Sequence, residues 1–284
     1  MTRHAPLAWM AILTLAACTA PEPAPSPVAS AAPVATAPSA APAHESPHWT
    51  YEGAAGPQAW GTLGTDFAKC ASGRSQSPID IGKTSSAELP ALRSAFRPAK
   101  LTIAHTEHVA DAINNGHTIE VDYPAGDTLT VGDTSYTLVQ YHFHAPSEHT
   151  VAGKHAPMEM HLVHKSEAGG LAVVGVLIEE GAANAAFDPI WSNLPKAAGA
   201  RSHLEHVEVD VDQLLPKTRT TWRYDGSLTT PPCSEDVKWL VMTTPVHLSA
   251  AQIAAFTAIV EPNNRPVQPL NDRVVATDRV AEAR

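Results

Sequence analysis

The chain is 284 residues long, 44% of its residues are hydrophobic, and its formal net charge is −10 at pH 7. A protein this acidic is poorly suited to nucleic acid as a partner, because contact with the phosphate backbone depends on lysine and arginine. The length and hydrophobic content suit one large domain with a sizeable core.

Residues 1–18 have the pattern of an export signal. Arg3 supplies an early positive charge, and residues 7–17 form an apolar run that is too short to span a bilayer. The run ends in Leu15-Ala16-Ala17-Cys18, which resembles a bacterial lipobox, where the cysteine is acylated and becomes the new N-terminus. We therefore expect an exported protein, periplasmic or in the cell envelope, that meets a membrane only through a lipid on Cys18. An ordinary secretory signal cut nearby is the alternative.

Residues 19–47 contain eight prolines and ten alanines, without an aromatic residue, lysine or arginine. Such a segment cannot bury a core, so it predicts an extended, semi-rigid tether. A tether after a lipid anchor would hold the next domain away from the membrane. That domain is expected over residues 48–284.

Strand-like runs dominate residues 48–284, and several of them alternate apolar and polar side chains. The clearest helix is predicted from the N-cap Ser249 to Val260, with Pro262 just beyond it. We expect a single mainly β (α+β) domain, with a large twisted, mostly antiparallel central sheet and a few peripheral helices. The predicted strands are 101–106, 118–123, 136–144, 158–164, 171–179, 207–211 and 237–242.

Three histidines in these strands have the spacing of a metal site. His142 and His144 stand two residues apart, so a strand would point both side chains to one face. His161 from another strand would complete three nitrogen ligands and leave a fourth position open, as in catalytic zinc sites. Gln140 and Glu159 each lie two residues before one of these histidines, where an oxygen could accept the second ring N–H. Without a metal, the same residues would be polar pairs on a solvated face.

Two cysteines, Cys70 and Cys233, lie within the predicted domain. In an exported protein two such thiols are expected to pair, although their spacing alone does not exclude free thiols.

Eight motifs together resemble the α-class carbonic anhydrases and occur in the order seen in that family. The resemblance covers residues 48–275. The two cysteines and the short link from His144 to Ser147 are similar to bacterial members. The motifs are His48-Trp49-x-Tyr51, Gln76-Ser77-Pro78-Ile79-Asp80-Ile81, Asn114-Asn115-Gly116-His117, Gln140-Tyr141-His142-Phe143-His144, Ser147-Glu148-His149-Thr150-Val151, Glu159-Met160-His161-Leu162-Val163-His164, Gly226-Ser227-Leu228-Thr229-Thr230-Pro231-Pro232 and Asn264-Arg265-Pro266.

The resemblance implies one Zn²⁺ per chain and reversible hydration of CO2 to bicarbonate and a proton, by attack of zinc-bound hydroxide. A weak esterase side activity is also expected, as is binding of sulfonamide and anion inhibitors at the zinc. The chain should be a monomer or a homodimer. The implied zinc ligands are His142, His144 and His161, with Gln140, Glu159 and the backbone carbonyl near Asn263 orienting their rings.

The remaining roles also follow from the resemblance. Thr229 matches the hydroxyl that accepts a hydrogen bond from the nucleophile, and Glu148 matches the carboxylate that accepts a hydrogen bond from the threonine hydroxyl. His117 matches the proton shuttle, for which an unperturbed imidazole pKa near 6.5 is suited. Ser77-Pro78 and Pro231-Pro232 match cis peptide bonds, and His149 and Tyr224 match structural positions. The CO2 pocket matches Val163, Val173, Leu228, Val237 and Trp239, and the water network matches Tyr51, Asn115 and Thr230.

Two departures and three rival functions remain. Ser75 stands where many relatives have a larger residue beside the Gln-Ser-Pro motif. Glu120 stands where the family usually has a neutral amide, and its carboxylate would raise the pKa of His117, alter inhibitor binding or face water. An inactive binding protein on this fold is disfavoured because the three histidines, Thr229 and Glu148 are all present. A zinc-delivery protein usually has an exposed histidine-rich tract, which this sequence lacks. A dedicated esterase would need an acyl pocket that no motif indicates.

Overall fold

The computed structural model describes residues 47–89, 92–96, 99–106 and 117–278. The predicted export signal, lipobox Cys18, the tether up to residue 46 and the water-network residue Asn115 lie outside the described residues. Within the described part, no helix is both long enough and apolar enough to cross a membrane.

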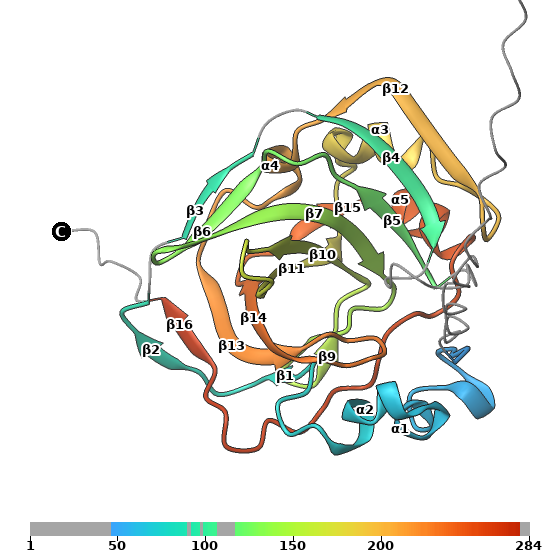
Figure 1. The fold of residues 1–284 in the computed structure, drawn as a ribbon. Coiled ribbons are helices and arrows are strands. Elements are labelled where there is room, and N and C mark those ends of the chain that lie inside the picture. The colour runs from blue at the N-terminus through green and yellow to red at the C-terminus, as the bar shows by residue number, and fades with distance from the viewer. Residues whose placement is uncertain (1–46, 90–91, 97–98, 107–116, 279–284) are drawn as a thin grey trace, which may run out of the picture. The chain divides into compact units, whose positions relative to one another are not determined.

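A thirteen-stranded sheet dominates the structure, in the order β12-β4-β5-β7-β10-β11-β14-β13-β16-β2, with β3, β6 and β15 attached beside this path. Most neighbouring strands are antiparallel, whereas β11 pairs in parallel with β14 and β15, and β16 with β2. Figure 1 shows the sheet as a strongly curled surface with β10 and β11 in its middle. The predicted fold class is therefore confirmed.

The strand bounds follow the chain. They are β1 Asp80–Ile81, β2 Ser85–Ala87, β3 Leu92–Ala95, β4 Ala99–Thr106, β5 Thr118–Asp122, β6 Thr128–Val131, β7 Thr134–His144, β8 Thr150–Val151, β9 Lys154–His155, β10 Met158–Lys165, β11 Leu171–Glu180, β12 Arg201–Val209, β13 Thr221–Ser227, β14 Glu235–Met242, β15 Val246–Leu248 and β16 Ala276–Asp278. Strands β1, β8 and β9 form a separate three-stranded sheet.

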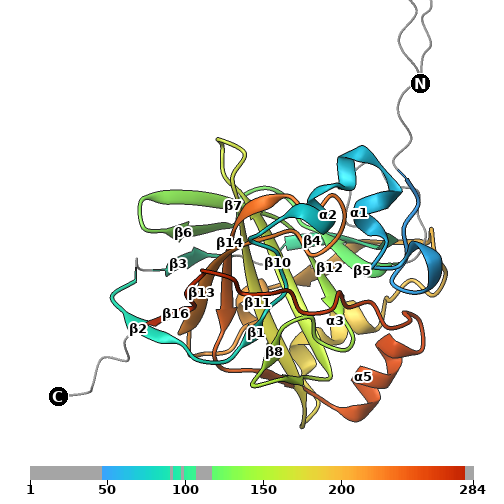
Figure 2. The same cartoon turned by 90° about the horizontal axis from the view of Figure 1, so that it is seen from below.

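Helices are short and peripheral. The α-helices are α1 Trp60–Leu63, α2 Lys69–Ser72, α3 Asp188–Trp191, α4 Val211–Leu214 and α5 Ala250–Thr257. The 3-10 turns are η1 Gly53–Ala55, η2 Thr65–Phe67 and η3 Ala185–Phe187. Figure 2 shows α1 and α2 together, apart from α3 and α5. The predicted helix is α5, and Ser249 caps it, as expected, in a reciprocal capping box with Gln252. The helix ends at Thr257, three residues before the predicted end at Val260.

One strand prediction is wrong at both ends. The predicted strand 207–211 corresponds to β12, but β12 begins at Arg201 and ends at Val209, and Val211 begins the helix α4. The physical reason for the end at Val209 is Asp210, whose side chain accepts a hydrogen bond from the backbone N–H of Asp212 and caps that helix. Val207, Val209 and Val211 alternate in the sequence, and this pattern extended the predicted strand past the cap.

Alternation along β7 and β10 separates the apolar core from the candidate site. Tyr141 and Phe143 of β7 and Met160 and Leu162 of β10 belong to the largest hydrophobic cluster. The residues between them, including the three histidines, point to the opposite face. Since both faces of these strands are buried, a register slip by one residue would bring imidazoles into the apolar core.

Candidate metal centre

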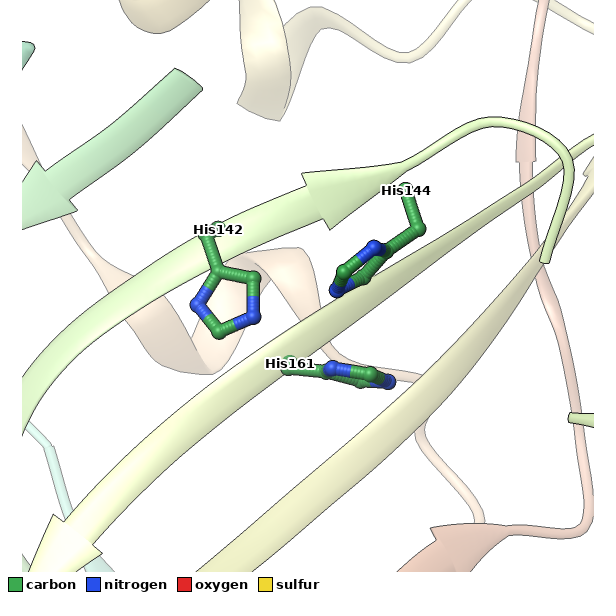
Figure 3. Close-up of side chains that lie close together, drawn as sticks. All are labelled: His142, His144 and His161. Atoms are coloured by element: carbon green, nitrogen blue, oxygen red, sulfur yellow. The ribbon is translucent and has the colours of Figure 1, made fainter. Parts of the chain in front are cut away.

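The three histidines come together because β7 and β10 are antiparallel neighbours. In the β7–β10 register, His142 is the direct partner of His161, and His144 is the direct partner of Glu159. One ring nitrogen from each histidine lies within 4.8 Å of the other two, and all three side chains are buried. Figure 3 shows the three rings turned toward a common centre. Sequence spacing therefore identified a real cluster.

Hydrogen bonds fix the tautomer of each ring. Nδ1 of His142 lies 2.7 Å from Oε1 of Gln140, and Nδ1 of His144 lies 2.7 Å from the backbone oxygen of Asn263. Nε2 of His161 lies 2.9 Å from Oε1 of Glu159. Since these oxygens only accept, the ring nitrogens beside them carry the protons. The lone pairs then lie on Nε2 of His142 and His144 and on Nδ1 of His161, a neutral donor set that fits Zn²⁺.

Glu159 is a fully engaged buried carboxylate. Its Oε2 accepts hydrogen bonds from the backbone N–H groups of Glu148, at 2.9 Å, and His149, at 2.8 Å. Its Oε1 lies 2.7 Å from Nδ1 of His149, whose Nε2 lies 2.7 Å from the hydroxyl of Tyr224. Burial would raise the pKa of Glu159, but its hydrogen bonds with His149 and His161 and the electrostatic attraction of these rings outweigh burial and hold the pKa well below its usual range. His149 and Tyr224 therefore brace the carboxylate, as expected of structural residues.

Gly175 of β11 makes room for this carboxylate. It is the direct β-sheet partner of His161. A Cβ atom at this position would lie 3.0 Å from Oε1 of Glu159 and 3.3 Å from Cγ2 of Val241. A side chain here would therefore press on the group that orients His161.

Thr229 and Glu148 lie beside the triad, as the sequence predicted. The Thr229 hydroxyl hydrogen-bonds to Glu148, and Oε1 of Glu148 also accepts from the backbone N–H of Arg265 at 2.9 Å. Oε2 of Glu148 lies 3.6 Å from Nε2 of His144 and 3.9 Å from Nδ1 of His161. Burial raises the pKa of Glu148 to about 8, against the two hydrogen bonds. A bound cation would oppose that rise, because it favours the charged carboxylate.

A largely apolar cavity of about 220 Å³ opens in front of the triad. Four of the five predicted CO2-pocket residues line it, and so does Thr230. Val237 does not: it is buried in the hydrophobic cluster behind the wall, with Val173 and Trp239. Val139, Lys165 and Leu171 line the cavity without having been predicted. The full lining is Val139, Gln140, His142, His161, Val163, Lys165, Leu171, Val173, Leu228, Thr229, Thr230 and Trp239.

His117 lines a different cavity, of about 470 Å³, together with Tyr51 and Asn263. Its ring packs edge-on against Trp49, and it is 5% exposed. Asn263 joins this cavity to the triad, because its Nδ2 donates to the backbone oxygen of His117 at 2.9 Å while its own backbone oxygen bonds to His144. His117 and Tyr51 are therefore near the triad but do not line its cavity in this conformation.

Glu120 lies next to a residue of the triad and is buried. It is the direct partner of His142 across β5 and β7, and it is 9% exposed. Of the three consequences considered from the sequence, free exposure of this side chain to water is therefore wrong.

Cys70 and Cys233 form a disulfide, as expected. The backbone N–H of Cys233 donates to the backbone oxygen of Thr230 at 2.8 Å. This hydrogen bond links one end of the disulfide to the segment that carries Thr229. The predicted cis bonds at Ser77-Pro78 and Pro231-Pro232 are present, and Ala145-Pro146 adds a third that was not predicted.

Arg265 is a buried residue whose role was missed from the sequence. Its guanidinium donates to the side chain of Gln76 at 2.9 Å, and to the backbone oxygens of Ser77 at 2.8 Å and Cys70 at 3.1 Å. Its backbone N–H holds Glu148. The residue thus links the disulfide segment to the carboxylate beside the triad. Its only sequence signal is its place in the motif Asn264-Arg265-Pro266.

Comparison with known proteins agrees with this geometry. The family model for eukaryotic-type carbonic anhydrase matches residues 55–279. A carbonic anhydrase of Klebsiella pneumoniae is 45% identical over 231 residues, covering 80% of this chain and 90% of the relative. One from Neisseria gonorrhoeae is 45% identical over 230 residues, covering 80% and 87%.

A solved structure gives the same result for the fold. The α-carbonic anhydrase from Thermovibrio ammonificans, in complex with the inhibitor sulfanilamide, superposes with a TM-score of 0.76 at 40% identity. The match covers 81% of this chain and 99% of that one. With the family model matching most of the chain and bacterial relatives at this identity, the chain belongs to the eukaryotic-type, or α-class, carbonic anhydrase family.

Proposed function

We propose that this protein catalyses the reversible hydration of CO2 to bicarbonate and a proton, with Zn²⁺ held by His142, His144 and His161. The observation that carries the proposal is the buried triad, whose hydrogen bonds leave three neutral nitrogen donors beside an apolar cavity. Zinc held there would act as a Lewis acid that makes hydroxide available near neutral pH.

Thr229 would orient the nucleophile. Because its hydroxyl donates to Glu148, its oxygen is left to accept a hydrogen bond from the attacking hydroxide. Glu148 keeps this direction as long as it is ionised, and the Arg265 backbone N–H supports the ionised form. A fixed acceptor of this kind aligns the nucleophile's lone pair with the carbon of CO2.

The apolar wall would receive CO2. Val163, Val173, Leu228 and Trp239 line the cavity beside the triad. Since CO2 has no net dipole, a dry surface that excludes water is a suitable receptor for it. Val237 would support this wall from behind through Val173 and Trp239.

His117 would carry the released proton toward solvent. An imidazole with an ordinary pKa exchanges protons readily near neutral pH. Its side chain lines the cavity next to Asn263, so transfer from the triad needs a rotation of the ring or a bridge of ordered water, to which Tyr51, Asn115 and Thr230 would contribute.

Stopped-flow measurement of CO2 hydration tests the proposal. We expect fast turnover in the zinc-loaded protein, loss of turnover after chelation, and recovery with Zn²⁺. Sulfanilamide should inhibit it, because it is bound by the Thermovibrio ammonificans relative. A folded, zinc-loaded protein without hydration activity would overturn the proposal and favour an inactive binding protein; ester hydrolysis is expected to be slow beside hydration.

We also propose that the protein is exported and held in the cell envelope by a lipid on Cys18, with residues 19–47 as its tether. The pattern Leu15-Ala16-Ala17-Cys18 and the proline-rich composition support this. In a bacterial host, the full chain should fractionate with membranes, and Cys18→Ser should release it or leave its signal uncut. Recovery of the unsubstituted chain wholly in the soluble fraction would contradict the proposal.

A further inference from the structure

The cavity in front of the triad has one charged side chain among the described residues that line it, Lys165. Lys165 is the last residue of β10, and it is exposed. Its ammonium makes no hydrogen bond or ion pair within the described part of the chain. A cation without a structural partner at the mouth of an apolar cavity is open to an anionic ligand.

The alternation of β10 aims Lys165 at the same face as the triad. Glu159, His161, Val163 and Lys165 are successive residues of one face, and β10 keeps an unbroken register with β11 over all of them. Along this face, Glu159 bonds to His161, Val163 belongs to the apolar wall, and Lys165 lies at the mouth of the cavity. The Cα atoms of His161 and Lys165 are about 13 Å apart in an extended strand, so a flexible lysine brings its charge within about 10 Å of the triad.

The rim around Lys165 is shaped by a bulge and a tight turn. Opposite Val163 and His164, β7 pairs through Gln140 and Leu138, so Val139 is an extra residue that faces the cavity and is 44% exposed. On the other side, Ser166 and Gly170 close the β10–β11 turn by a backbone hydrogen bond of 2.9 Å. The connection is therefore too short to fold back over the lysine.

The charge of the whole protein gives this lysine a role. At −10, the protein repels anions in general. Bicarbonate, the product of hydration and the substrate of the reverse reaction, is an anion that must nevertheless reach and leave the triad. The apolar wall excludes water from the cavity side of Lys165, so its field toward the triad is screened less than it would be in bulk water.

We propose that Lys165 forms an anion subsite at the mouth of the cavity, which attracts bicarbonate and other small monovalent anions. The subsite rests on the proposed function, since it serves the same cavity. It makes Lys165 a residue that sets anion affinity, whereas the neutral substrate CO2 gains little from it.

Substitution with matched charge controls tests the subsite. Lys165→Gln removes the charge, Lys165→Arg keeps it, and Lys154→Gln makes the same change of net charge on β9, away from the cavity. Two readouts are needed: KM for bicarbonate in dehydration at about pH 6, and the apparent bicarbonate Kd obtained from the dependence of Tm on bicarbonate concentration in the zinc-loaded protein.

At low ionic strength, Lys165→Gln should raise both values about three- to tenfold, as expected for unit charges about 10 Å apart in a medium between protein and water. This loss should exceed the change in hydration kcat/KM at pH 9 by at least threefold, and it should shrink as salt approaches about 1 M, where the Debye length is about 3 Å. Lys165→Arg should restore anion affinity.

Equal anion affinity in Lys165→Gln and Lys154→Gln would overturn the subsite, provided that both hydrate CO2. Weakening that persists at high salt would also overturn it, because a charge subsite is screened. If the unsubstituted zinc-loaded protein does not hydrate CO2, the proposed function fails instead. The Tm titration then still reports whether Lys165 attracts an anion.

Discussion

At the scale of single residues, the orientation of the three histidine rings is fixed by the hydrogen-bond acceptors beside them. Two amide oxygens, from the Gln140 side chain and the Asn263 backbone, and one carboxylate oxygen, from Glu159, each occupy one ring nitrogen. The third differs from the first two in bonding Nε2, so His161 would bind the metal through Nδ1. The geometry therefore requires one ring to approach the metal from a different edge.

Removing one acceptor should weaken zinc binding without unfolding the protein. Gln140→Leu leaves a side chain of similar size but no oxygen for Nδ1 of His142. Loss of such a partner typically costs 10–100-fold in metal affinity, and we expect a zinc Kd raised by about that factor. Competition with a chelator measures the Kd, and Gln213→Leu on α4 is the matched control. Unchanged affinity in Gln140→Leu would show that the ring is oriented by packing alone.

Thr229 should affect catalysis but not metal content. Thr229→Ala removes the hydroxyl that bonds to Glu148, and we expect hydration kcat/KM to fall about 10²-fold, the order seen when a preorganised hydrogen bond at a reacting group is lost. Thr229→Ser keeps the hydroxyl and should stay within about tenfold of the original. Stopped-flow rates and zinc analysis distinguish the cases. Equal losses in the alanine and serine variants would argue against an orienting hydrogen bond.

At the scale of secondary structure, strand period explains what was predictable. β7 and β10 were located to within two residues because their histidines alternate with apolar side chains, and the same alternation placed the triad on one face. β13 was missed: Thr221–Ser227 has few apolar residues and ends in Gly226-Ser227, so its composition resembles a loop. It is a strand because β14 and β16 pair with it on either side.

Side-chain roles that depend on distant segments were beyond the sequence. Arg265 gains its function only because the chain brings residues 70–77 against it, and Val237 does not line the cavity because it is buried behind Val173 and Trp239. The position of His117 depends on packing against Trp49 and Asn263. The family resemblance supplied which residues matter, whereas their neighbours required the structure.

The disulfide should support both stability and activity through the segment after β13. It closes a loop between residues separated by 163 positions, which in the chain-entropy model contributes at most about 5 kcal/mol. Since Cys233 bonds to Thr230, we expect a Cys70→Ser/Cys233→Ser double variant to lose both thermal stability and hydration kcat/KM.

Calorimetry and stopped-flow kinetics on the oxidised, reduced and double-serine proteins measure these two effects. The reduced protein, assayed at a temperature where it is still folded, should resemble the serine variant. Unchanged turnover in the reduced, folded protein would separate the disulfide from the position of Thr229.

At the scale of the whole molecule, the curled sheet buries polar groups on one face of β7 and β10 and apolar groups on the other. His164 is an exception, because it lies with the apolar residues. It is fully buried, its Nδ1 lies 2.9 Å from the backbone oxygen of Leu162, and the centroid of its ring lies 5.9 Å from that of Phe96. Burial lowers its pKa to about 4, although backbone hydrogen bonds at Leu162 and Ala172 oppose the shift.

This histidine should make the protein sensitive to acid independently of the metal. In the unfolded chain His164 takes up a proton near pH 6.5, whereas in the folded protein it does so only near pH 4. The unfolded state thus binds more protons between these values, so the free energy of unfolding falls as pH falls. The contribution of His164 is complete above pH 6.5 and is lost by pH 4, a change of about 3 kcal/mol.

Replacing His164 by a residue that cannot titrate should flatten this dependence. We expect His164→Leu to lose less unfolding free energy than the original protein between pH 7.5 and pH 4.5, whatever its stability at neutral pH. Urea unfolding in the presence of a chelator measures both without interference from zinc release, and His247→Gln, on the exposed face of β15, controls for loss of a histidine. Parallel pH profiles for His164→Leu and the original protein would show that acid sensitivity arises elsewhere in the fold.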